Sequence, residues 1–305
     1  MGMTSANLCY FCREVLLEAN TIYEGLHKAC FCRWFGLDMP QEFVDVFARS
    51  SEKISNEWAH ITSSFFHGKF RKYSARLGQK NYLLKVQQAE LPELPGTEFL
   101  CNQLARQLGL IVPNFFYIRF QNTLDTFVCE NFMKEFSGTN LIHIYRFLGS
   151  PDEYTCKGIL KVIEREVGRA DEMNRFIHLT LFDALIGNHD RHGRNLALIQ
   201  SSTGLILSPF YDNPSYLALE DPLLLAAHHE PRGAIATSQT MEPTMRDYVN
   251  EWNRLGFSET VTEFKNRINL VDIFEIIELS FISEKRKKAF NRLITRRYEE
   301  FCHAS

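Results

Sequence analysis

The chain has 305 residues, of which 45% are hydrophobic and 23% are charged, and its formal net charge at pH 7 is −3. This length allows a large buried core or two lobes of ordinary domain size, so we expect a soluble globular protein. The charge excludes the strongly basic surface that indicates nucleic-acid binding, and no apolar run reaches the roughly 18 residues that would predict a membrane span. The first residues lack the basic start and apolar core of a secretory signal, so we expect a cytoplasmic location.

Four of the eight cysteines lie near the N-terminus. Cys9 and Cys12 are separated by two residues, as are His27 and Cys30, and three thiolates with one imidazole are a typical ligand set for tetrahedral Zn²⁺. We expect a structural zinc site, because four protein ligands leave no position for a catalytic water, and Cys32 is an alternative ligand to His27 or Cys30. Without zinc, these residues would be ordinary small buried side chains.

A short helix and a β-hairpin are predicted after this segment. Gln41–Ala48, which follows Pro40, has apolar residues at the spacing of an amphipathic helix. Two extended runs, Tyr73–Leu77 and Tyr82–Val86, are divided by Gly78–Asn81, which predicts a hairpin with a four-residue connection.

A helix and two further strands follow the hairpin. Thr97–Leu108 has apolar residues at helical spacing and ends at Gly109, and Asn114–Phe120 and Thr126–Cys129 have strand character. The order hairpin, helix, two strands is that of the small lobe of a kinase. From Leu141 onward the pattern is mainly helical.

The strongest predicted helix, Glu172–Ile186, leads into the most informative part of the sequence. It stops at Gly187, and the loop that follows contains Asp190 and, five residues later, Asn195; a second carboxylate, Asp212, comes seventeen residues further on. A kinase uses such a set to orient a hydroxyl group and to hold Mg²⁺ on ATP. The alternative is a helix that ends in a polar surface loop.

A second hairpin is predicted between the two halves of this set. Leu196–Ile199 and Leu205–Leu207 have strand character, and pairing them would bring Asp212 back beside Asn195. We expect His192 to brace the loop.

The motif residues resemble the HipA-type serine/threonine kinases, which include toxins of bacterial toxin–antitoxin pairs. The resemblance rests on Gly187–His192 with Asn195 and on Ser208–Asp212, and it extends in the same order over residues 9 to 215. It implies a two-lobed α/β kinase-like fold, with ATP and Mg²⁺ as cofactors. Further similar segments are Cys9–Gly36, Tyr82–Lys85, Thr97–Phe99, Leu108–Pro113 and Phe127–Phe132.

The resemblance assigns a role to each matching residue. Lys85 would hold the ATP phosphates, with Glu98 as its ion-pair partner, and the backbone of Glu130 to Phe132 would contact adenine. Asp190 would orient the substrate hydroxyl, while Asn195 and Asp212 would hold Mg²⁺. The remaining matches are His192 in the catalytic loop and Gly68 and Tyr211 at the nucleotide.

Two departures affect the nucleotide contacts. The phosphate loop keeps Gly68 and Lys72 but has Phe70 where the family usually has glutamine, and the serine that such kinases often autophosphorylate has no match beside Gly68. Ser63 and Ser64, slightly upstream, are the nearest candidates for autophosphorylation.

We therefore expect residues 1–37 to form a cysteine-rich zinc-knuckle-like segment, residues 38–132 the small lobe, and residues 133–305 a helical lobe with the catalytic loop. The expected activity is ATP-dependent phosphorylation of serine or threonine in a protein. The resemblance implies an aminoacyl-tRNA synthetase or another translation factor as substrate and a DNA-binding antitoxin as partner. A secreted effector kinase is equally compatible with the sequence.

Two other functions remain open. The run Asp190–His192 with Asn195 also resembles the catalytic loop of phosphoinositide kinases, and Lys285–Lys288 is a basic run that a lipid kinase would need at a membrane. The second alternative is a non-catalytic zinc-knuckle binding module on a degenerate kinase scaffold, which the altered phosphate loop favours.

Overall fold

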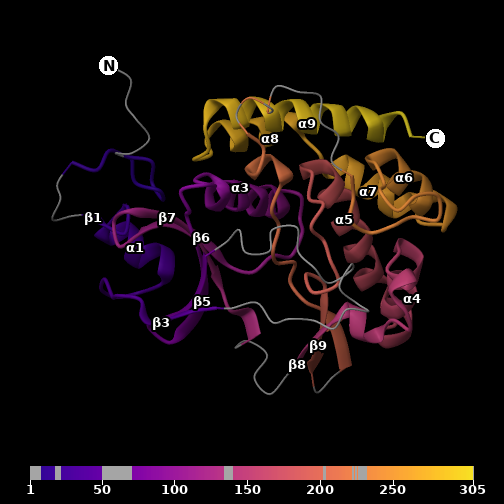
Figure 1. The fold of residues 1–305 in the computed structure, drawn as a ribbon, viewed down its shortest axis with the longest axis horizontal. Helices are drawn as coiled ribbons and strands as arrows, with labels where there is room; N and C mark the ends of the chain where they lie inside the picture. The colour runs from indigo at the N-terminus through magenta and orange to yellow at the C-terminus, as the bar shows by residue number, and fades with distance from the viewer. Residues whose placement is uncertain are drawn as a thin grey trace.

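A computed structural model describes residues 8–17, 22–49, 71–133, 140–201, 204–221, 223, 225 and 232–304. Its N-terminal part is rich in strands and its C-terminal part is mainly helical (Figure 1). None of the helices in these ranges has the length and apolar character needed to cross a bilayer.

A five-stranded antiparallel sheet forms the centre of the N-terminal part. Its order is β3-β4-β5-β7-β6, and helix α3 (Leu94–Gln107) packs against β6 and β7. Alternate strand residues are buried between the sheet and this helix, which places the side chains of β5 in register with those of β7. The strands are β3 (Val44–Ala48), β4 (Arg71–Leu77), β5 (Lys80–Val86), β6 (Phe115–Phe120) and β7 (Leu124–Glu130).

The predicted hairpin is confirmed with a shorter connection. Leu77 pairs with Lys80, so only Gly78 and Gln79 form the turn, and Gly78 has the positive φ of +56° that a tight turn requires.

The predicted helix at Gln41–Ala48 is wrong, because this segment contains the edge strand β3. Val44, Val46 and Phe47 are 42%, 38% and 67% exposed, so they bury no helical face that would stabilise a helix. The segment instead gains backbone pairing with β4, and its β-branched residues suit an extended chain.

The cysteine-rich segment packs against the sheet. It contains the short strands β1 (Ile22–Tyr23) and β2 (Leu26–His27) and helix α1 (Lys28–Phe35), which lies beside the sheet in Figure 1. The ring of Phe35 stacks on that of Phe116 in β6, with 4.2 Å between the ring centroids. The segment and the sheet therefore share one hydrophobic core.

The C-terminal part is built around α5, which contacts α4, α6, α7 and α9. A second sheet with the order β10-β9-β8 lies at its edge (Figure 1). The elements are β8 (Asn140–His143), α4 (Cys156–Glu166), α5 (Ala170–Ile186), β9 (Ala197–Ser201), β10 (Gly204–Leu207), α6 (Met245–Arg254), α7 (Ser258–Arg267), α8 (Leu270–Glu278), α9 (Glu284–Cys302) and the 3₁₀ helices Ile144–Phe147, Pro151–Glu153 and Tyr216–Ala218.

The end of α5 fixes where the predicted catalytic loop begins. Gly187 ends the helix with a φ of +70°, and a Cβ atom there would lie 2.8 Å from the ring of Tyr216. Only glycine fits both conditions, so the chain leaves α5 at this residue and enters the loop on a rigid support.

Candidate functional site

The main cavity lies between the strand-rich part and the helical part and has a volume of about 910 Å³. Most of the residues predicted to bind ATP and metal meet here, although they come from six separate segments. Gly68, Ser63 and Ser64 lie outside the described residues. The predicted residues that line the cavity are Lys85, Glu98, Glu130, Phe132, His192, Asn195, Tyr211 and Asp212.

Lys85 connects the two parts across this cavity. Its side chain, which is only 2% exposed, forms ion pairs with Glu98 of α3 and with Asp212. Burial disfavours the charged ammonium group, but the carboxylates of Asp212 and Glu98 outweigh it and raise the pKa of Lys85. A buried lysine that is held charged by two carboxylates is suited to contacting phosphate.

Asp212 carries a permanent negative charge. Burial alone would raise the pKa of this carboxyl group, but Lys72, 3.7 Å away, and Lys85 lower it far below its usual range. Its backbone has a positive φ of +51°, which is uncommon outside glycine and is typical of strained positions at functional sites.

Asn195 lies on the other side of the cavity with its amide group oriented. The side-chain nitrogen donates a hydrogen bond of 3.0 Å to the backbone oxygen of Asp190. Its side-chain oxygen is therefore the atom available to a cation. Together, Asn195 and Asp212 offer one neutral and one anionic oxygen ligand, which is a donor set that fits Mg²⁺.

Asp190 lies beside this cavity and is buried, with the catalytic-loop backbone wrapped around it. Its N–H group donates to Oδ1 of Asn188 at 3.0 Å, and one of its carboxylate oxygens is 4.0 Å from Nε2 of His192. Because the N–H of Arg194 donates to Nδ1 of His192, the proton of the neutral imidazole resides on Nε2, facing Asp190.

His192 is neutral at pH 7. Burial lowers its pKa to about 4, with help from Arg191 and Arg194 and against the opposing effect of Asp212. A neutral imidazole beside Asp190 orients that carboxylate without adding a charge, which agrees with the bracing role expected from the sequence.

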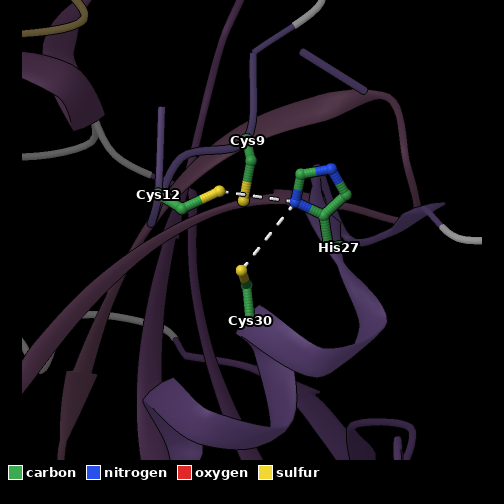
Figure 2. Close-up of side chains that lie close together, drawn as sticks. All are labelled: Cys9, Cys12, His27 and Cys30. Carbon is green, nitrogen blue, oxygen red and sulfur yellow. Dashed lines mark hydrogen bonds between the residues drawn. The ribbon is translucent and has the colours of Figure 1, made fainter. Parts of the chain in front are cut away.

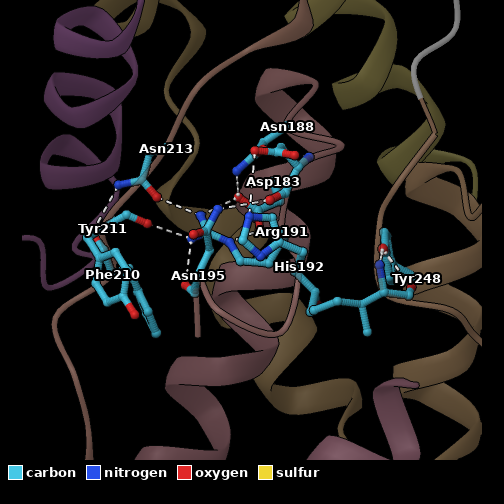
Figure 3. Close-up of polar contacts among 12 residues, drawn as sticks. Asp183, Asn188, Arg191, His192, Asn195, Phe210, Tyr211, Asn213 and Tyr248 are labelled. Carbon is cyan, nitrogen blue, oxygen red and sulfur yellow. Dashed lines mark hydrogen bonds and ion pairs between the residues drawn. The ribbon is translucent and has the colours of Figure 1, made fainter. Parts of the chain in front are cut away.

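A buried guanidinium group joins the catalytic loop to the segment that carries Asp212 (Figure 3). Arg191 is 1% exposed and donates to both carboxylate oxygens of Asp183 in α5, at 2.8 and 2.9 Å. It also donates to the backbone oxygens of Asn195 and Tyr211, at 3.1 and 2.7 Å, and to Oδ1 of Asn213 at 2.6 Å. Arg191 thereby fixes the distance between the two metal-ligand candidates.

Sequence reasoning missed this network. Asp183 is a carboxylate within the apolar helix α5, and Asn188 donates to it at 2.9 Å. A charged residue inside an apolar helix was the available signal, because burial of a carboxylate requires a partner such as Arg191.

The predicted adenine-binding strand end is partly used by the fold itself. The N–H groups of Glu130 and Asn131 donate to the backbone oxygens of Asn114 and Asn81, both at 2.8 Å, so neither is available to a ligand. The side chain of Glu130 pairs with Lys80 at 2.8 Å.

Aromatic rings lie at the same end of the cavity. Phe132 and Tyr211, both predicted from the sequence, have ring centroids 5.9 Å apart. Tyr211 is held by a hydrogen bond of 2.9 Å from its hydroxyl to the backbone oxygen of Arg194. These rings offer an apolar surface suited to a planar base.

The four predicted zinc ligands converge in the cysteine-rich segment (Figure 2). The ligand atoms of Cys9, Cys12, His27 and Cys30 all lie within 4.8 Å of one another. Nδ1 of His27 is 3.4 Å from Sγ of Cys12 and 3.8 Å from Sγ of Cys30. Zn–S bonds of about 2.3 Å require comparable separations between ligand atoms, so the cluster fits tetrahedral zinc. Among the described residues, Cys32 is not part of it.

Backbone groups also prepare this cluster for a metal. Burial alone would raise the pKa of Cys9, but backbone hydrogen bonds from Cys12, His27 and Phe11 lower it overall. Donors aimed at a buried sulfur stabilise the thiolate form, which is the form that binds metal.

The comparisons with known proteins agree with this geometry. The chain matches the profile of the HipA-like C-terminal domain over residues 51–293, while no curated protein matches it. The proinflammatory kinase CtkA of Helicobacter pylori is similar over 76% of this chain and 88% of its own length, with 18% identity and a TM-score of 0.63. HipA of the Shewanella oneidensis MR-1 toxin–antitoxin system, solved with HipB and operator DNA, is similar over 72% of this chain and 57% of its own length, with 16% identity and a TM-score of 0.53. The structural similarity confirms the expected mixed α/β kinase-like fold.

Proposed function

Because this chain belongs to the HipA-like kinase family, we propose that it transfers the γ-phosphate of ATP to serine or threonine residues of a protein. One observation carries the proposal. Lys85, Asn195 and Asp212 line one cavity of about 910 Å³, with Asp190 beside it, although they are far apart in the sequence. This is the minimum set that phosphoryl transfer requires.

Each residue has a role that follows from its surroundings. Lys85, held by Glu98, contacts the phosphates, and Asn195 and Asp212 hold Mg²⁺, which when bound neutralises charge on the phosphates. Asp190 accepts a hydrogen bond from the hydroxyl of the substrate and orients its oxygen toward the γ-phosphate.

ATP binding would change the partners of Lys85. Without nucleotide, its ammonium group bridges Glu98 and Asp212. A phosphate oxygen replaces Asp212 as its partner, which frees the carboxylate of Asp212 for Mg²⁺, while the pair with Glu98 persists. The charge balance of the buried site is then maintained through the exchange.

We place the substrate among proteins of translation, such as an aminoacyl-tRNA synthetase, as the family resemblance implies. HipA of Shewanella oneidensis was solved with HipB and operator DNA, which supports a DNA-binding antitoxin as a partner here; a secreted effector kinase is the second possibility. Ser63 or Ser64 is the proposed site of autophosphorylation. The proposed units are residues 1–37, 38–132 and 133–305.

Incubation with γ-labelled ATP and a cell lysate tests this function. We expect Mg²⁺-dependent label on serine or threonine of a few proteins, identified by mass spectrometry, above a control without the protein. Label found only in the lipid extract would instead indicate a lipid kinase. ATP binding without any transfer would indicate a non-catalytic module.

We also propose that the cysteine cluster binds one structural Zn²⁺. Protein purified under reducing conditions without chelator is expected to contain about one zinc per chain by elemental analysis. Cys12→Ser removes one of the four ligands, so the zinc content and the melting temperature should both fall.

Cys302→Ser is the matched control for the zinc experiment, because Cys302 is an exposed cysteine at the end of α9 and is not part of the cluster. It should leave the zinc content and the melting temperature unchanged. Wild-type protein without zinc, or equal zinc in Cys12→Ser, would contradict the assignment.

A further inference from the structure

A second cavity of about 410 Å³ lies where the cysteine-rich segment, α3, β6 and α8 meet. It shares no lining residue with the nucleotide cavity. In Figure 1, α3 lies between the sheet and α8, which agrees with this position. The residues that give it its chemical character are Phe11, Arg13, Trp34, Phe99, Gln103 and Arg106.

Two guanidinium groups in this cavity have no carboxylate partner among the described residues. Arg13 lies over the ring of Phe281, 3.7 Å from its centroid, and Arg106 lies over the ring of Phe115 at 4.3 Å. Burial lowers the pKa of Arg13 to about 10, and it also lowers the pKa of Arg106. Positive charge that is partly buried without an anion favours an anionic ligand.

Aromatic side chains form the neighbouring wall. Phe11 and Trp34 are half-buried, with ring centroids 5.3 Å apart, and Trp34 lies 6.2 Å from Phe99 of α3 at a nearly perpendicular angle. Half-buried rings around a cavity offer edge-to-face contacts to another aromatic side chain.

Gln103 adds a polar group to the wall. Its side-chain oxygen is buried and has no hydrogen-bond partner within the described part of the chain. A buried acceptor of this kind is costly unless a ligand donates to it, and a peptide N–H group is a suitable donor.

We propose that this cavity binds a peptide segment of a partner protein in which an aromatic residue is flanked by acidic residues. The carboxylates pair with Arg13 and Arg106, the aromatic ring packs on Phe11 and Trp34, and a backbone N–H group donates to Gln103. Charge complementarity selects this occupant, because an apolar peptide would leave both guanidinium groups unpaired. The site goes beyond the proposed kinase function and does not depend on it.

Fluorescence anisotropy with the full chain and a labelled peptide, Glu-Asp-Phe-Glu-Phe-Asp, tests the proposal. We expect saturable binding that Arg13→Gln and Arg106→Gln each weaken about tenfold, because each removes a charge-assisted hydrogen bond. Arg33→Gln is the matched control. Arg33 belongs to the same segment and lies 5.8 Å from the centroid of the Phe11 ring, but it does not line the cavity, so its loss should leave the affinity unchanged.

A second variant separates binding from folding. Gln103→Glu places a carboxylate inside the cavity beside the arginines, so peptide binding should fall while the melting temperature is maintained or raised. Peptides with amides in place of the acids, or alanine in place of phenylalanine, should each bind about tenfold more weakly.

The proposal is overturned if the wild-type chain shows no saturable binding, if the neutral peptide binds as tightly as the acidic one, or if Arg33→Gln weakens binding as much as Arg13→Gln. None of these results depends on phosphate transfer, so they leave the kinase function to its own test.

Discussion

Asp190→Asn is expected to lower the rate of phosphate transfer by about 10²- to 10⁴-fold with little change in folding, because asparagine keeps the size of the side chain but is not a proton acceptor of comparable strength. The buried carboxylate lies 4.0 Å from Nε2 of His192, and asparagine keeps an oxygen for that contact. The backbone bond from Asp190 to Asn188 does not involve the side chain and persists.

Initial rates with γ-labelled ATP, together with a thermal unfolding curve, measure this effect. Asp171→Asn is the control, since Asp171 is an exposed carboxylate in the first turn of α5 that pairs with Arg169. It should retain wild-type activity. Wild-type rates for Asp190→Asn would remove Asp190 from the mechanism.

Asp212→Asn is expected to abolish most of the Mg²⁺ dependence of ATP binding. In the wild-type protein, the carboxylate of Asp212 provides the anionic oxygen for the metal, and we expect ATP to bind at least about tenfold more tightly with Mg²⁺ than with chelator. The variant keeps the pair between Lys85 and Glu98, so the lysine remains charged and the phosphates keep that contact.

Calorimetric titration with ATP, with and without Mg²⁺, measures this difference. Asp45→Asn is the matched control, because Asp45 lines the same cavity but pairs with Arg76 at 2.9 Å in the sheet. It should preserve the Mg²⁺ dependence. An unchanged Mg²⁺ dependence in Asp212→Asn would rule out its role as a metal ligand.

The sequence predicted most of the site because its residues lie at the ends of regular elements. Lys85 is on a strand with clear alternation, Glu98 is in the first turns of a periodic helix, and Asn195 and Asp212 flank a hairpin. When strands and helices are identified correctly, their known packing brings such positions together. The same reasoning grouped the four cysteine-cluster ligands, whose spacing is local.

Long-range contacts explain what the sequence did not predict. Residues 44–48 form an edge strand because β4 lies beside them, although their apolar spacing also fits a helix. Arg191 looked like one more polar residue in a motif, and its role depends on Asp183, Tyr211 and Asn213 converging on it. The second cavity is formed by segments from three distant parts of the chain, so no local pattern indicated it.

The most direct test of the central claim is a crystal structure of the protein with Mn²⁺ and a non-hydrolysable ATP analogue. We predict an anomalous manganese peak between the side-chain oxygens of Asn195 and Asp212, with Lys85 contacting a phosphate oxygen. A nucleotide or a manganese ion bound away from these three residues would contradict the account.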